Sequence, residues 1–93
     1  MFFAAHPEIN NSVKLNWISL AENTTGYFKI ERSQFGKQFS EISSIKCSGN
    51  SAGLKKYSFT DKIPLDGISY YRLSCLNDEG NKIDQARIFF HPE

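Results

Sequence analysis

Three observations on the sequence predict an all-β domain, a small sandwich of two sheets. Short segments of alternating apolar and polar residues recur along the chain, which is typical of half-buried strands. Turns rich in Gly, Asn, Ser and Pro separate these segments at regular spacing. The 93 residues, 40% apolar and 14% aromatic, suffice for one hydrophobic core and leave no room for a second. We therefore expect a single domain over residues 1–93, excised from a larger protein because Met1 directly precedes an expected strand.

The expected strands are named by their residue ranges: 2–5, 13–17, 27–33, 39–45, 57–61, 69–76 and 82–90. Segment 39–45 also has apolar residues three apart, as a helical turn would, but its serines, β-branched isoleucines and short length favour an irregular edge strand. Polar segments 21–26 and 47–56 are expected to be connecting loops. In the hairpin 33–37, Gly36 is expected to adopt a positive φ.

Alternation also predicts which side chains form the core. Trp17 alternates with Val13 and Leu15, which favours a place in the core over an exposed platform that stacks on a ligand. The other strands contribute their inward-facing residues in the same way. The expected core consists of Val13, Leu15, Trp17, Phe28, Ile30, Tyr57, Phe59, Tyr71 and Leu73.

The rest of the chain is expected to be arranged around the segment 64–76. Pro64, Asp66 and Gly67 indicate a turn, and period-two alternation follows from residue 69. A leucine entering the turn, Leu65, and a tyrosine six residues later, Tyr71, are typical of the tyrosine corner of β-sandwiches. The ring of Tyr71 is then expected in the core, with its hydroxyl bonded back to the backbone.

The composition excludes several function classes. Eleven basic and ten acidic residues give a net charge of +1, which offers no electrostatic basis for binding nucleic acid or an anionic membrane. No apolar run approaches the ~20 residues that span a bilayer. The histidines lie near opposite ends and no Cys-x-x-Cys occurs, so no metal or other cofactor is expected. Cys47 and Cys75 are expected to be thiols, with Cys75 a small buried core residue.

The strand motifs, taken together and in order, resemble the fibronectin type III-like domains of secreted and cell-surface proteins of the Bacteroidetes type. These motifs are Val13-Lys14-Leu15-Asn16-Trp17, Tyr27-Phe28-Lys29-Ile30-Glu31-Arg32-Ser33, Gly36-Lys37-Gln38-Phe39, Gly49-Asn50-Ser51, Tyr57-Ser58-Phe59-Thr60-Asp61 and Tyr70-Tyr71-Arg72-Leu73. The resemblance implies a seven-stranded, immunoglobulin-like sandwich in which strands A-B-E pack on C′-C-F-G. It also implies a secreted or cell-surface location, and the family offers no common catalytic residues. The chain departs from the family pattern at Phe35 and at Ser74-Cys75.

Catalysis is not expected, because most carboxylates lie in turns or on outward faces and neither histidine lies in an expected strand. A binding surface has more support. The outward face of strands C and F brings together residues of the types enriched at interfaces, although such rings also meet as ordinary cross-strand pairs. Stacking on a carbohydrate would require coplanar, exposed rings. The residues of this possible contact face are Tyr27, Lys29, Glu31, Tyr70, Arg72 and Ser74.

These observations favour a non-catalytic, monomeric accessory module that spaces or positions the domains of a larger extracellular protein. Its expected partners are neighbouring domains of the same chain. The alternative is a module that recognises a protein or a carbohydrate through the outward C–F face.

Overall fold

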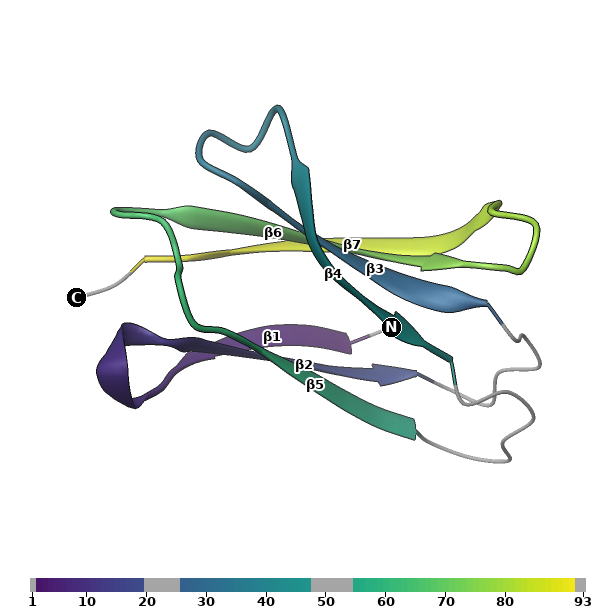
Figure 1. The fold of residues 1–93 in the computed structure, drawn as a ribbon, viewed down its shortest axis with the longest axis horizontal. Helices are drawn as coiled ribbons and strands as arrows, with labels where there is room; N and C mark the ends of the chain where they lie inside the picture. The colour runs from purple at the N-terminus through teal and green to yellow at the C-terminus, as the bar shows by residue number, and fades with distance from the viewer. Residues whose placement is uncertain (1, 20–25, 48–54, 92–93) are drawn as a thin grey trace.

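The protein folds into two antiparallel β-sheets that lie one on the other (Figure 1). The computed structural model describes residues 2–19, 26–47 and 55–91. Sheet order is β1-β2-β5 in one layer and β4-β3-β6-β7 in the other. The elements are β1 (Phe2–Pro7), the short 3-10 helix η1 (Ile9–Asn11), β2 (Val13–Ser19), β3 (Tyr27–Ser33), β4 (Ser40–Lys46), β5 (Lys55–Asp61), β6 (Ser69–Leu76) and β7 (Lys82–Phe90). The prediction of an all-β protein with two packed sheets is confirmed.

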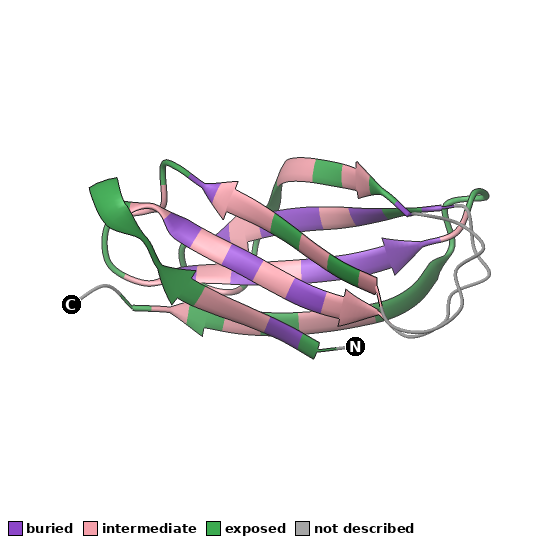
Figure 2. Cartoon of the chain, turned by 90° about the horizontal axis from the view of Figure 1, so that it is seen from below, coloured by how far each residue is buried: buried purple, intermediate pink, exposed green. Residues whose placement is uncertain are grey.

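The core lies between the sheets and follows the alternation of the sequence. Along β2, buried and half-buried residues alternate, as the banding in Figure 2 shows. Trp17 is fully buried, stacks on Tyr57 at 5.7 Å between ring centroids, and packs edge-on against Phe28 at 5.6 Å. The predicted core residues that are fully or almost fully buried are Val13, Leu15, Trp17, Phe28, Ile30, Tyr71 and Leu73.

Two predicted core residues, Tyr57 and Phe59, are only half-buried, although both pack against the core. Both belong to β5, which is an edge strand paired on one side alone with β2. An edge strand keeps one flank open, so its inward side chains are covered from fewer directions. Alternation predicted the correct face for both residues and overestimated their burial.

The turns agree with the sequence wherever the structure describes them. Gly36 and Gly67 have φ angles of 78° and 76°, the left-handed region in which a Cβ would clash. The predicted edge strand 39–45 is confirmed as β4, which begins and ends one residue later than predicted, and its pairing with β3 is interrupted by a bulge. The predicted loops 21–26 and 47–56 lie mostly outside the described residues.

Gly26 marks a close approach of two backbone segments at the start of β3. A Cβ at this position would lie 1.7 Å from the carbonyl oxygen of Leu76 and 2.6 Å from the Cα of Asn77. Both neighbours are backbone atoms, which cannot rotate away as a flexible side chain can. This end of the β3–β6 pair therefore requires a residue without a side chain.

Both cysteines are buried thiols, and Cys75 lies in the core on β6 as predicted. No helix among the described residues is long and apolar enough to cross a membrane.

Candidate functional site: the outer face of the four-stranded sheet

The candidate site is the solvent-facing side of the four-stranded sheet, which we call the outer face. Strand register assigns its members, because antiparallel partners point their side chains to the same side. The predicted contact residues of β3 and β6 all belong to it, and β4 and β7 extend it on either side. The outer face comprises Tyr27, Lys29, Glu31 and Ser33; Glu41, Ser44 and Lys46; Tyr70, Arg72, Ser74 and Leu76; and Lys82, Gln85, Arg87 and Phe89.

Glu31 and Arg72 are directly opposite each other on β3 and β6 and form a two-pronged ion pair. Arg72 Nε donates to Glu31 Oε1 at 2.8 Å, and Arg72 Nη2 donates to Oε2 at 3.0 Å. Lys29 Nζ lies 3.9 Å from Oε2 of the same carboxylate. These donors lower the pKa of Glu31 below its ordinary value, with the hydrogen bonds from Arg72 as the largest cause.

Glu31, one of the residues of the predicted contact face, is covered by its neighbours. Its side chain lies on the expected face, but the residue is only 6% exposed. Alternation gives the direction of a side chain, not what lies over it. Here the guanidinium of Arg72 covers and neutralises the carboxylate, so Glu31 is not available to a partner.

An aromatic ring from the end of the β3–β4 connection lies against the arginines. The guanidinium carbon of Arg72 is 4.2 Å from the ring centroid of Phe39, and that of Arg87 is 5.6 Å from it. Both distances allow cation–π attraction. Phe39 therefore joins β4 to β6 and β7 across the outer face.

The aromatic residues of the outer face do not form a flat platform. Tyr70 and Phe89 are cross-strand neighbours with centroids 6.1 Å apart, but their rings are inclined at 47° to each other. Tyr70 is half-buried, and a Cβ on Gly36 would lie 3.3 Å from its ring, so the β3–β4 turn packs on it. Tyr27 is 37% exposed, and Phe89 is 64% exposed. This tilted pair lacks the coplanar geometry that favours stacking on a sugar ring.

Three further outward residues, Ser33, Ser74 and Leu76, are buried by their neighbours. Ser74 is 2% exposed, and its hydroxyl accepts a hydrogen bond from Gln85 Nε2 at 3.0 Å across β6 and β7. Leu76 is 7% exposed at the end of β6. The solvent-exposed members of the outer face are Tyr27 on β3, Glu41, Ser44 and Lys46 on β4, and Lys82, Arg87 and Phe89 on β7.

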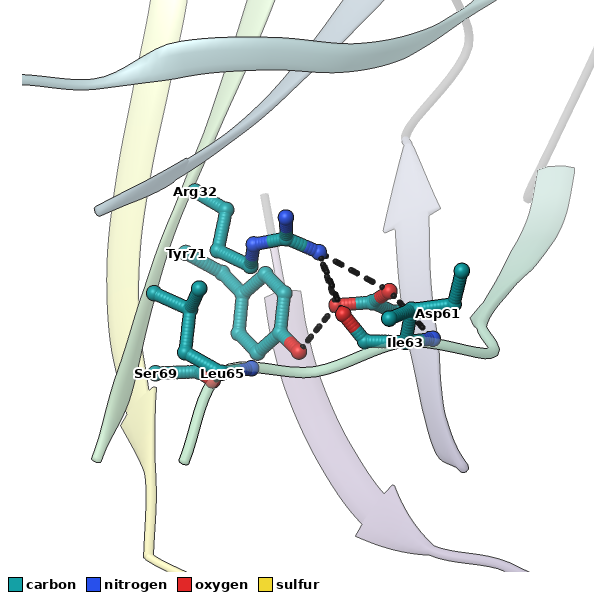
Figure 3. A network of polar contacts seen from close by, with 6 residues as sticks. All are labelled: Arg32, Asp61, Ile63, Leu65, Ser69 and Tyr71. Carbon is teal, nitrogen blue, oxygen red and sulfur yellow. Dashed lines mark hydrogen bonds and ion pairs between the residues drawn. The ribbon is translucent and has the colours of Figure 1, made fainter. Parts of the chain in front are cut away.

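A second polar cluster lies between the sheets, where Asp61 at the end of β5 accepts hydrogen bonds from two strands of the opposite sheet (Figure 3). Arg32 Nη1 on β3 donates to Oδ1 at 3.0 Å and to Oδ2 at 2.9 Å. The Tyr71 hydroxyl on β6 donates to Oδ2 at 2.7 Å, and the backbone N–H of Ile63 donates to Oδ1 at 3.1 Å. Arg32 also donates to the Ile63 carbonyl at 3.0 Å. The end of β5 is thus bound to β3 and β6 of the opposite sheet.

This cluster corrects the predicted tyrosine corner. The ring of Tyr71 is fully buried, as expected, but its hydroxyl bonds to the Asp61 carboxylate and not to the backbone. The backbone at Leu65 is bonded instead by the neighbouring serine, because Leu65 N–H donates to Ser69 Oγ at 3.0 Å. Burial, reinforced by Asp61, raises the pKa of the Tyr71 phenol well above its ordinary value.

Sequence reasoning assigned no role to Arg32 or to Asp61 within this cluster. The sequence did contain an indication at Arg32, because alternation along β3 places it on the same inward side as Phe28 and Ile30. A cation on the inward side of a strand needs a buried acceptor, and only 5% of Asp61 is exposed. The identity of that acceptor depends on a contact 29 residues distant in sequence, which alternation cannot show.

The structure also contains a hollow of about 780 Å³ at the end of the sandwich near the C-terminal strand. The η1 segment, the 62–67 turn, Phe90 and His91 line it. Within the described residues, no three His, Cys, Asp or Glu side chains are grouped to hold a metal ion. Comparison of the chain with protein-family models, with curated proteins and with solved structures found no match.

Proposed function

We propose that this chain is a non-catalytic accessory module, fibronectin type III-like in organisation, that spaces or positions the domains of a larger extracellular protein. One observation carries the proposal. The two carboxylates that are buried among the described residues, Glu31 and Asp61, are each held by an arginine of the same chain. An acid or base catalyst needs a carboxylate free to exchange a proton with a substrate. Both of these carboxylates instead support the sheets.

The shape of the molecule is suited to spacing. The fold measures 39 × 26 × 16 Å along its principal axes, so it is elongated. The start of β1 and the end of β7 are well separated along the long axis (Figure 1). A chain that enters at one point and leaves at the other therefore holds its flanking segments apart. Packing of Trp17, Tyr71 and Phe28 between the sheets makes this separation rigid.

The exposure of Tyr27 and Phe89 favours a second role, recognition of a protein or glycan by the outer face. Aromatic side chains provide large contact area at interfaces. A shallow surface of this kind gives weak intrinsic affinity. Tethering in one chain supplies a high effective concentration, so a neighbouring domain can dock on this surface with little intrinsic affinity. We therefore rank the recognition role second.

Binding by the isolated chain tests the choice between the two roles. We expect glycan arrays and pull-down with candidate proteins to give no micromolar or tighter ligand. Micromolar binding that disappears in the Tyr27→Ala/Tyr70→Ala double variant and persists in Lys55→Ala would favour recognition and contradict the spacing role. Lys55→Ala is the matched control because Lys55 lies on β5 in the other sheet.

A further inference from the structure

The outer face carries an excess of positive charge that the whole chain does not have. Its basic residues outnumber its acidic residues by five to two, whereas the full sequence has eleven basic and ten acidic residues. Both acidic residues, Glu31 and Glu41, are cross-strand partners on the β3–β4 side. The five basic residues are Lys29, Lys46, Arg72, Lys82 and Arg87.

The positive charge is most concentrated where two arginines face each other. Arg72 on β6 and Arg87 on β7 are direct cross-strand partners, and like charges in this relation repel. Glu31 neutralises Arg72 with both carboxylate oxygens. No carboxylate among the described residues lies within ion-pair distance of Arg87, whose guanidinium contacts the ring of Phe39. One arginine of the pair is therefore neutralised internally, and the other is exposed, with no ion-pair partner in the described part of the chain.

The Glu31–Arg72 pair shows what kind of anion this surface accepts. A planar guanidinium presents two parallel donors that match the two oxygens of a carboxylate. Phe89 lies two residues beyond Arg87 on the same face of β7 and is 64% exposed. An exposed ring beside a guanidinium suits a protein segment, which offers apolar and acidic side chains together. A nucleic acid or sulfated polymer would require a longer track of cations than these strands provide.

We propose that the outer face docks an acidic, partly apolar protein segment, with a carboxylate on Arg87 and an apolar side chain on Phe89. The external carboxylate repeats at Arg87 the arrangement that Glu31 makes at Arg72, and it relieves the repulsion between the two arginines. This inference rests on the proposed accessory role because it names the chemistry of the neighbour that the module positions. It assigns no catalytic step.

The test is a titration of the ¹⁵N-labelled chain with a soluble, capped Leu-Glu-Phe-Glu-Leu peptide, followed by NMR. We expect saturable shifts of β7 amides and of the Arg87 side-chain N–H, with a dissociation constant in the millimolar range. Arg87→Gln should weaken binding by about tenfold, which corresponds to the loss of roughly one charge-assisted hydrogen bond. Lys55→Gln removes the same charge from the other sheet and should leave the affinity unchanged.

Several results would overturn the docking proposal. They are absence of saturable shifts, equal affinity for the peptide with Gln in place of Glu, and equal weakening by Arg87→Gln and Lys55→Gln. Tighter binding of a heparin oligosaccharide than of the acidic peptide would also overturn it, because the surface would then be a sulfate site. None of these results bears on the spacing role, which requires no ligand, so failure of the two proposals is distinguishable.

Discussion

The hydroxyl of Tyr71 donates a 2.7 Å hydrogen bond to Oδ2 of Asp61, and this bond joins the centre of one sheet to the end of a strand in the other. The same carboxylate accepts both hydrogen bonds from Arg32. Asp61 is thus the common acceptor for two strands of the four-stranded sheet. Its side chain is 6% exposed, so water competes little for these bonds.

Removing the Tyr71 hydroxyl tests the strength of this connection. We expect Tyr71→Phe to lower the free energy of unfolding by about 1.5–3 kcal/mol, because the bond is to a charged group. Asp61→Ala should cost more, since it leaves both Arg32 and the phenol without their acceptor. In a double-mutant cycle measured by urea unfolding, the two effects should be non-additive by about 1 kcal/mol or more. Additive effects would contradict the coupling, and Ser58→Ala on the exposed side of β5 is the control.

The pH dependence of stability tests the Glu31–Arg72 pair. Hydrogen bonds from Arg72 hold the pKa of Glu31 below its ordinary value of 4.5. A lowered pKa means that the pair stabilises the fold above pH 4.5 and that this stabilisation is lost as pH falls through the lowered value. We expect Glu31→Gln to be less stable than the parent at pH 7, with the difference shrinking in acid. Urea unfolding at several pH values measures this difference in stability. A difference that does not change with pH would contradict a stabilising Glu31–Arg72 pair. Glu79→Gln in the exposed 77–80 turn is the control.

Trp17 provides a test of core packing. Its indole ring is fully buried, and its Nε1 has no hydrogen-bond partner among residues 2–19, 26–47 and 55–91. We expect Trp17→Ala to cost about 3–5 kcal/mol through lost burial and a large cavity. Trp17→Phe should cost clearly less, because it keeps much of the ring and removes an unsatisfied donor. Equal losses of stability in chemical unfolding would show that the indole is not the packing centre.

Gly26 tests the close approach between β3 and the end of β6. We expect Gly26→Ala to destabilise the protein by more than about 2 kcal/mol, because the added methyl group meets backbone atoms of Leu76 and Asn77. Gly80 has a φ of 84°, which strains any side chain, but a Cβ there would have no heavy atom within 4 Å, so Gly80→Asn should cost less than Gly26→Ala. Thermal unfolding of both variants measures the contrast. Equal, small effects would contradict the close approach.

Alternation along the strands was sufficient to predict the strands themselves and most of the core. It succeeded at Trp17 and Phe28 because period-two patterning directly reports which side of a strand is buried. It overestimated the burial of Phe59, because a pattern within one strand does not reveal that the strand lies at an edge. Positive φ at Gly36 and Gly67 was predictable because turn chemistry is local.

The polar contacts were harder to predict from the sequence. Glu31 was placed on the correct face, but its cover by Arg72 requires knowledge of the strand register between β3 and β6. The partner of the Tyr71 hydroxyl was missed because Asp61 reaches it through the three-dimensional arrangement of two sheets. Side-chain pairing across elements depends on register and twist, which composition and periodicity do not determine.

The distance between the two ends of the folded chain tests the spacing role most directly. Dyes attached beyond β1 and beyond β7 report that distance by single-molecule energy transfer. We expect one narrow population, unchanged as urea rises until the whole domain unfolds cooperatively. Asp61→Ala should lower the urea concentration of that transition without broadening the folded population. A broad or multiply peaked distribution in the parent chain without urea would contradict a module that holds its neighbours at a fixed separation.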